Sequence, residues 1–243
     1  MKKITAQTAS RICALVIGPA GIGKTSLLRS IAGQKYDPAT GAWEQAYEPA
    51  GRVCTLSAES GLLCVRDLVT SGQVEGYEIE SYKDMADILA QLNRQEFQER
   101  YQWIFIDSLT EISARCVEYA KSRFPSSSDT FKVWGEYNDA MTALIKAYRD
   151  MTQYNVVFTC LETIDKDQNN VRYKAPMVSG SGLKERLTSY FDEVLYMDRL
   201  IDENGAARIV FKTRELGVAK DRSGRLAAIE EPSLLEIRNK ILA

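Results

Sequence analysis

The 243-residue sequence contains no histidine, and its five cysteines are dispersed along the chain. Without histidine, the Ser-His and Cys-His nucleophile pairs are excluded, together with nearly all zinc sites that use imidazole. None of the cysteines shows Cys-x-x-Cys spacing, so we expect free thiols with a packing role at Cys13, Cys54, Cys64, Cys116 and Cys160. Any catalysis must therefore use carboxylates, lysines, arginines and a metal ion.

Long apolar runs are also absent. No stretch approaches the about 18 apolar residues that a membrane span needs, and polar residues instead of an apolar signal core follow Met1. These features predict a cytoplasmic protein without a membrane anchor. The net charge of −2 leaves nucleic-acid binding open, because basic loops can stand on an acidic body. We see no repeat or linker, so we expect one domain over residues 1–243.

A phosphate-binding motif stands near the N-terminus. The segment 18–25 satisfies the P-loop pattern of glycine, four residues, glycine, lysine, and serine or threonine. An apolar run at 12–17 predicts a buried strand before it, and residues 26–32 predict a helix after it that Gly33 ends. Strand, loop and helix thus come in the order that a P-loop requires.

The residue types of this motif suit a nucleotide. Glycines let consecutive backbone N–H groups point at phosphate oxygens, and the positive end of the following helix faces the same charge. Lys24 would neutralise phosphate and act in catalysis, and Thr25 would hold Mg²⁺. The predicted nucleotide-binding residues are Gly18, Pro19, Ala20, Gly21, Ile22, Gly23, Lys24, Thr25 and Ser26.

Two carboxylates follow predicted strands. Glu59 stands after the strand 52–58, and Asp107 ends the apolar strand 102–107 in the manner of a Walker B strand. Ligands of doubly wound sheets bind at the carboxyl ends of the strands, so both acids and the P-loop can share one cleft. Asp107 is predicted to hold the Mg²⁺ shell and Glu59 to be catalytic. The alternatives are a helix cap for Glu59 and a turn residue for Asp107.

Helices and strands alternate along the remaining chain, which predicts an α/β fold with a mostly parallel sheet. Helices are expected at 84–97, 110–121, 136–152 and from Ser233, where Glu236 would complete a capping box. Strands are expected at 76–81 and 155–160, with a small hairpin at 36–43 and a late hairpin formed by 193–198 and 207–212. The polar segment 162–184 is predicted to be a long functional or disordered loop.

Together, the P-loop, the strand ending in Glu59, the strand ending in Asp107-Ser108, and the late hairpin followed by Lys220-Asp221-Arg222 resemble the RecA-type ATPase core. The resemblance covers nearly the whole chain. It is closest to the small stand-alone RecA-fold ATPases of bacteriophages that act in single-strand annealing and recombination. It implies a RecA-like P-loop NTPase fold, ATP and Mg²⁺ as cofactors, and a homo-oligomeric ring or filament with ATP at the subunit interfaces. It also implies a phage-infected or prophage-bearing bacterial cell.

The resemblance assigns further roles. It implies that Glu59 orients the attacking water, and that Lys220 and Arg222 reach the γ-phosphate of a neighbouring subunit. The other interpretation of residues 220–222 is a solvated basic turn. The loop after the Cys160 strand corresponds to the DNA-binding loop of the family, with phosphate contacts from Lys166, Arg172, Lys174 and Lys184. The loop after Ser122 would be its weaker partner.

The sequence departs from this family at the sensor position. There the family usually places Gln or His at the end of the strand that here reads Thr159-Cys160-Leu161-Glu162. Leucine has no side-chain hydrogen-bonding group. Coupling of hydrolysis to DNA therefore requires Thr159 or Glu162 to substitute, and we expect slow hydrolysis.

The leading hypothesis is an oligomeric, Mg²⁺-dependent ATPase that binds single-stranded DNA and acts in annealing or recombination, with a single-strand DNA-binding protein as a conceivable further partner. A helicase motor or loader of the DnaB type shares every motif. A nucleotide-gated DNA-binding module with little turnover is the alternative from another class. A GTPase is disfavoured because no Asn-Lys-x-Asp element occurs, and a small-molecule kinase lacks an evident acceptor pocket.

Overall fold

The computed structural model describes residues 10–37, 40–59, 61–125, 130–166, 169–201, 203, 205–215 and 218–243. Parts of several predicted segments lie outside these ranges. They are the lead-in at 1–9, the tip of the small hairpin at 38–39, residues 126–129 of the loop after Ser122, residues 167–168, and residues 202 and 204 of the late turn.

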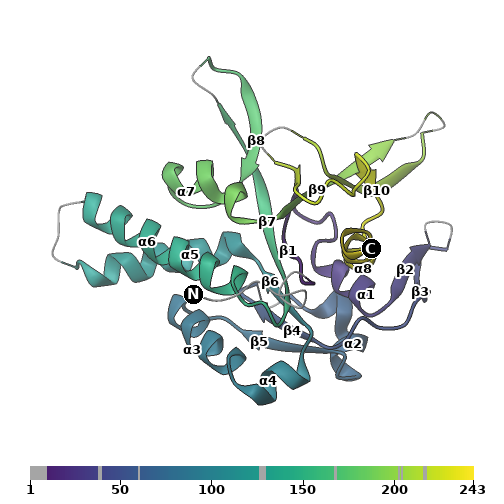
Figure 1. Cartoon of the computed structure of the whole chain (residues 1–243). Coiled ribbons are helices and arrows are strands. Elements are labelled where there is room, and N and C mark those ends of the chain that lie inside the picture. The colour runs from purple at the N-terminus through teal and green to yellow at the C-terminus, as the bar shows by residue number, and fades with distance from the viewer. Residues whose placement is uncertain are drawn as a thin grey trace.

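A mostly parallel sheet forms the centre of the molecule (Figure 1). The strand order is β12-β10-β9-β1-β7-β6-β4-β5. The parallel strands are β1 (Cys13–Gly18), β4 (Val53–Ser57), β5 (Val74–Glu78), β6 (Trp103–Asp107), β7 (Asn155–Lys166) and β9 (Glu193–Ile201). The antiparallel additions are β10 (Ala207–Lys212), β11 (Lys220–Asp221) and β12 (Ile229–Glu230). The predicted α/β class and the C-terminal hairpin are confirmed.

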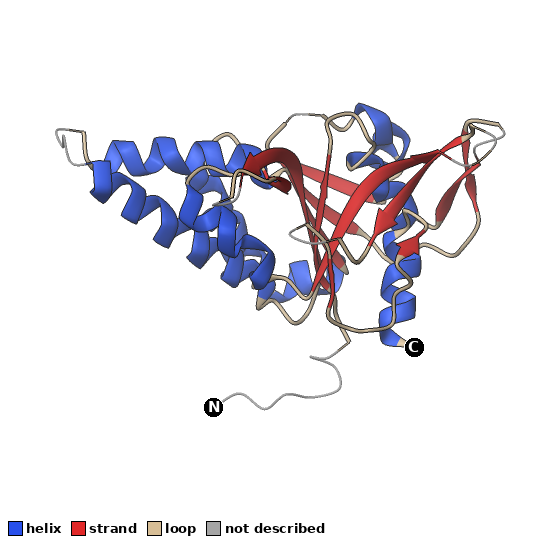
Figure 2. Ribbon diagram, turned by 90° about the horizontal axis from the view of Figure 1, so that it is seen from above, coloured by secondary structure: helices blue, strands red, loops and turns tan. Residues whose placement is uncertain are grey.

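Helices cover both faces of the sheet (Figures 1 and 2). One face packs against α3 (Tyr82–Leu92), α5 (Leu109–Arg123) and α6 (Thr130–Arg149). The other face packs against α1 (Leu28–Ile31), α2 (Arg66–Thr70) and α8 (Leu234–Leu242). The remaining described helices are α4 (Gln95–Arg100) and α7 (Ser181–Arg186), and 3₁₀ turns span Thr25–Leu27, Leu63–Val65 and Leu187–Tyr190.

Burial on both faces explains why the central strands are continuously apolar in sequence. Successive side chains of a strand point to opposite faces. Leu15 and Ile17 of β1 accordingly belong to the core under α5 and α6, whereas Val16 belongs to the core under α1 and α8. A polar residue in these strands is therefore exceptional, and the polar positions at their carboxyl ends mark the site.

Three helix predictions were wrong in extent. The helix expected at 136–152 begins at Thr130 and ends at Arg149. The expected helix 84–97 is interrupted, because Arg94 takes an extended conformation and the side chain of Asn93 donates to Leu89 O at 2.9 Å. The helix expected at 26–32 is a 3₁₀ turn followed by the single turn of α1, so the aligned peptide dipole after the P-loop is short. At α8, Ser233 accepts from Glu236 N at 3.2 Å, but the Glu236 carboxylate accepts from the Tyr47 hydroxyl at 2.8 Å.

The prediction of a long loop at 162–184 was also wrong. Strand β7 continues beyond the sheet to Lys166 and pairs antiparallel with β8 (Arg172–Pro176). We call residues 162–166 and 172–176 the arm, which projects from the sheet in Figure 1. Helix α7 begins after the four residues 177–180, so most of the described part of this polar segment is regular structure.

Three smaller expectations can be compared with the structure. The small hairpin is confirmed as β2 (Gln34–Asp37) paired antiparallel with β3 (Ala42–Gln45). All five cysteines are free, and Cys64 alone among them is exposed. Within the described ranges, no helix combines the length and apolar character needed to cross a bilayer.

The packing of the core predicts how much the free energy of unfolding falls when a buried side chain is truncated. Phe158 is fully buried and meets Tyr148 and Phe191 edge-on, with ring centroids 6.3 and 5.2 Å away. Phe158→Ala should lower the free energy of unfolding by about 3–5 kcal/mol, because the cavity forms between rigid elements. Leu63→Ala, at a side chain that is 85% exposed, should change it by less than about 0.5 kcal/mol. Denaturant titration measures both, and equal effects would contradict the described core.

Candidate nucleotide and magnesium site

The P-loop connects the carboxyl end of β1 to α1. Gly18 pairs with Leu161 of β7, and a Cβ added to Gly18 would lie 2.7 Å from the carbonyl oxygen of Met197. Gly21 and Gly23 have φ angles of 73° and 100°, in the region that favours glycine. The motif glycines are therefore required by close packing at one position and by backbone conformation at two others.

Lys24 lies inside the curve of this loop. Its side chain is 8% exposed, and its Nζ donates to the carbonyl oxygens of Gly18 at 2.9 Å and Pro19 at 2.8 Å. Burial lowers the pKa of Lys24 below its ordinary value, and the Asp107 carboxylate partly counters that shift. The loop thus holds a buried cation beside a carboxylate, a position suited to a phosphate chain.

Asp107 joins the P-loop to two strands. Its carboxylate is 4% exposed and accepts from the Thr25 hydroxyl at 2.6 Å and from the Thr159 hydroxyl at 2.5 Å. These are charge-assisted bonds, and they satisfy a carboxylate that would otherwise be costly to bury. The structure therefore brings together Thr25 and Asp107, the two residues predicted to hold the metal.

Glu59 lies beside this group, as expected from the sheet. Ser57 of β4 pairs with Asp107 of β6, so the residues that follow both strands emerge together. The Ser108 hydroxyl donates to Oε1 of Glu59 in a short hydrogen bond. Glu59 is thus held at the site by the residue after Asp107.

The donor set fits Mg²⁺. This ion prefers oxygen ligands and is usually held by one or two protein groups together with substrate phosphates. Thr25 Oγ1 and Asp107 Oδ2 supply two such oxygens 2.6 Å apart. The part of the chain that the structure describes contains no cluster of three or more histidine, cysteine or acidic side chains, as a fully protein-coordinated metal would need.

The sensor strand offers one side chain to this site. Thr159 bonds Asp107, whereas Leu161 N donates to Thr110 Oγ1 at 3.0 Å. The Glu162 carboxylate accepts from the Tyr196 hydroxyl at 2.5 Å and belongs to the base of the arm. Of the two substitutes that the sequence offered, Thr159 alone contacts the Walker B aspartate. The signal for Thr159 in the sequence was a polar side chain within an otherwise apolar strand.

The four basic residues predicted to bind DNA fall into two pairs. Lys166 and Arg172 are exposed and face each other in register near the end of the arm. Lys184 pairs with Asp165 at 2.9 Å. Lys174 donates to the Tyr196 hydroxyl. The first pair is available to a ligand, whereas the second pair anchors the arm to the body.

Lys220 and Arg222 lie far from the P-loop of their own chain. Lys220 pairs with Val194 near the start of β9. This position is at the amino ends of the parallel strands, whereas Gly18 stands at the carboxyl end of β1. Its Nζ donates to the carbonyl oxygens of Thr188, at 3.1 Å, and Phe191. Arg222 is 70% exposed and pairs with Asp192 at 2.8 Å. The two residues do not complete the site of their own subunit.

A second Lys-x-Arg sequence, at residues 212–214, was not predicted to be functional but lies closer to the P-loop. Lys212 ends β10 opposite Tyr196, and Tyr196 is level with Ile17 of β1. Lys212 pairs with Asp198 at 2.7 Å, and Arg214 is exposed. The sequence offered one signal for this pair, because Lys212 and Arg214 stand at the end of the late hairpin with the same Lys-x-Arg spacing as residues 220–222.

The sequence model of a family described as an AAA domain matches residues 10–223. No curated protein matches the chain. The matched span contains the P-loop, Glu59, Asp107, Thr159 and the arm, so the whole site described above lies within the matched region. The chain therefore belongs to this family of AAA domains, with a P-loop ATPase fold.

Proposed function

We propose that this protein is an oligomeric, Mg²⁺-dependent ATP hydrolase that binds single-stranded DNA. It would act in phage-type recombination or single-strand annealing, in the cytoplasm of a bacterial cell. The observation that carries the catalytic part is the Asp107 carboxylate bonded to Thr25 beside the buried Lys24, with Glu59 held next to it by Ser108.

Each group then has a chemical task. The loop N–H groups and Lys24 bind the phosphates, while Thr25 and Asp107 hold Mg²⁺, which when bound neutralises charge on the phosphate oxygens. Glu59 orients the attacking water and accepts its proton. The hydrogen bond from Ser108 fixes the direction of the Glu59 carboxylate, so the base is positioned before substrate binds.

The arm supports the DNA-binding part of the proposal. Its base lies at the same edge of the sheet as the P-loop, because β7 pairs with β1 up to Leu161 and then continues into the arm. Exposed cations at Lys166 and Arg172 stand near exposed Ile164 and Tyr173. Cations that follow a phosphate backbone beside side chains that accept bases are typical of single-strand binding.

The first test separates the base from the phosphate cation. Glu59→Gln keeps the shape of the side chain but removes proton acceptance, so ATP binding should persist while hydrolysis falls by about 10²-fold or more. Lys24→Ala should instead abolish ATP binding, because the loop loses its buried charge. Calorimetry and phosphate release measure the two effects. Wild-type turnover in Glu59→Gln would return Glu59 to a capping role.

The second test concerns the arm. Replacing Lys166 and Arg172 with Ala should weaken single-stranded DNA binding and reduce the slope of log affinity against log salt by about 1.4, at about 0.7 per phosphate contact. Replacing exposed Lys83 and Arg94, on α3 and just after it, is the matched control and should leave the slope unchanged. An unchanged slope in the arm variant as well would place the DNA path elsewhere.

The oligomeric part of the proposal rests on the position of Arg222. Lys220 and Arg222 lie near the amino ends of the parallel strands, whereas the P-loop of the same chain lies at the carboxyl ends. Any contact of theirs with a γ-phosphate therefore requires a second copy of the chain. Arg222 is the more available of the two, since the Lys220 ammonium is turned onto backbone carbonyls. A cation supplied in this way stabilises charge that develops in phosphoryl transfer.

The third test mixes two inactive variants. A Lys220→Ala/Arg222→Ala subunit keeps Glu59, and a Glu59→Gln subunit keeps the basic pair, so their mixture should regain ATP hydrolysis that neither shows alone. A second mixture combines the Glu59→Gln subunit with a Lys212→Ala/Arg214→Ala subunit. It tests whether the Lys-x-Arg that lies nearer to the P-loop supplies the charge instead. If co-assembled mixtures stay as inactive as their components, the proposed trans-acting role of Lys220 and Arg222 fails.

A further inference from the structure

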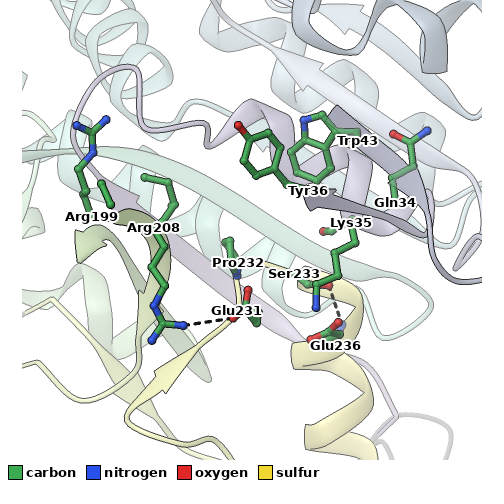
Figure 3. Close-up of a pocket in the computed structure, with 13 residues that line it drawn as sticks. Gln34, Lys35, Tyr36, Trp43, Arg199, Arg208, Glu231, Pro232, Ser233 and Glu236 are labelled. Atoms are coloured by element: carbon green, nitrogen blue, oxygen red, sulfur yellow. Dashed lines mark hydrogen bonds and ion pairs between the residues drawn. The ribbon is translucent and has the colours of Figure 1, made fainter. Parts of the chain in front are cut away.

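A cavity of about 350 Å³ lies between the β2–β3 hairpin and the β9–β10 hairpin. Figure 3 shows Tyr36 and Trp43 on one side, Arg199 and Arg208 on the other, and Pro232 between them. Its volume is within the range of small-molecule sites. None of its lining residues belongs to the P-loop, Glu59, Asp107 or the arm.

The chemistry of the lining is aromatic and cationic. The rings of Tyr36 and Trp43 are 5.5 Å apart, and Tyr36 remains 46% exposed although it lines a cavity. Arg208 is engaged by Glu231 at 3.5 Å. Among the residues that the structure describes, the side chains of Lys35 and Arg199 make no hydrogen bond or ion pair. The guanidinium of Arg29 lies over the Trp43 ring, 6.0 Å from its centroid, so Tyr36 supplies most of the exposed aromatic surface. The cavity thus offers this surface together with a guanidinium, that of Arg199, which is free to bind a ligand.

The cavity adjoins the phosphate site through two shared elements. Ser30 lines it from α1, five residues after Thr25 of the P-loop. Met197 of β9 lies against the P-loop, because a Cβ added to Gly23 would be 3.8 Å from the methyl group of Met197. Arg199 follows two residues later and lies on the same face of the strand as Met197. A ligand held by the P-loop can therefore extend along β9 and α1 into the cavity.

We propose that this cavity receives the base of the nucleotide whose phosphates the P-loop binds. The base stacks on the exposed ring of Tyr36, with the Trp43 ring inclined to it by 58°, and the planar guanidinium of Arg199 covers its other side. Aromatic rings and arginine planes are the surfaces on which bases stack, and they tolerate different bases because every base has a π-face. Purine nucleotides are favoured over pyrimidine nucleotides, since the larger ring system covers more of the aromatic pair. The inference rests on the proposed nucleotide-binding function.

The test compares a nucleotide with its phosphate chain alone. In the full-length protein, Tyr36→Ala/Trp43→Ala should weaken ATP binding about ten-fold, as expected for a lost base stack, while the affinity for inorganic tripolyphosphate stays unchanged. Arg199→Ala should show the same split between the two ligands. Trp43→Phe keeps an aromatic surface and should restore ATP affinity to within about two-fold of wild type. Trp134→Ala, on α6 under the other face of the sheet, is the control and should change neither affinity.

Each other outcome has a defined meaning. If ATP and tripolyphosphate affinities are both unchanged in the double variant, the base lies elsewhere and the proposal is overturned. If single-stranded DNA affinity falls while ATP affinity does not, the cavity is a nucleic-acid site, which also overturns it. Wild-type protein that binds neither ATP nor tripolyphosphate would refute the proposed function itself. Unaltered thermal unfolding and circular dichroism verify that the hairpin still folds.

Discussion

The structure of the candidate site depends on one buried carboxylate. Asp107 accepts hydrogen bonds from Thr25 of the P-loop turn and from Thr159 of β7, and it ends β6. A carboxylate that is 4% exposed is tolerable only when both oxygens are satisfied. Strand β7 lies between β1 and β6, so the strand order brings Thr25 and Thr159 within hydrogen-bonding distance of Asp107.

The polar residues at the strand ends were predictable because the end of an apolar run can be identified from neighbouring residues in the sequence. Apolar runs buried on both faces mark the parallel strands, and Glu59 and Asp107 stand where those runs stop. Their convergence then follows from the parallel pairing of β4 with β6. The hydrogen bond between Ser108 and Glu59 was less accessible, because it depends on side-chain directions after two separate strands.

The arm escaped prediction for a physical reason. A two-stranded ribbon outside the sheet buries neither face fully, so it lacks the apolar alternation that identifies a strand, and its polar composition resembles that of a loop. Contacts distant in sequence anchor it instead. Lys184 pairs with Asp165, and Met177 N donates to Leu161 O at 2.7 Å. The same anchoring explains why only Lys166 and Arg172 of the four predicted cations remain available.

The arm and the P-loop are supported by consecutive residues of one strand. The Tyr196 hydroxyl donates to Glu162 and accepts from Lys174, one on each strand of the arm. The next residue, Met197, is packed against Gly18 so closely that no Cβ fits between them. The P-loop and the base of the arm therefore contact neighbouring residues of β9, and this chain of contacts does not include Leu161 at the sensor position.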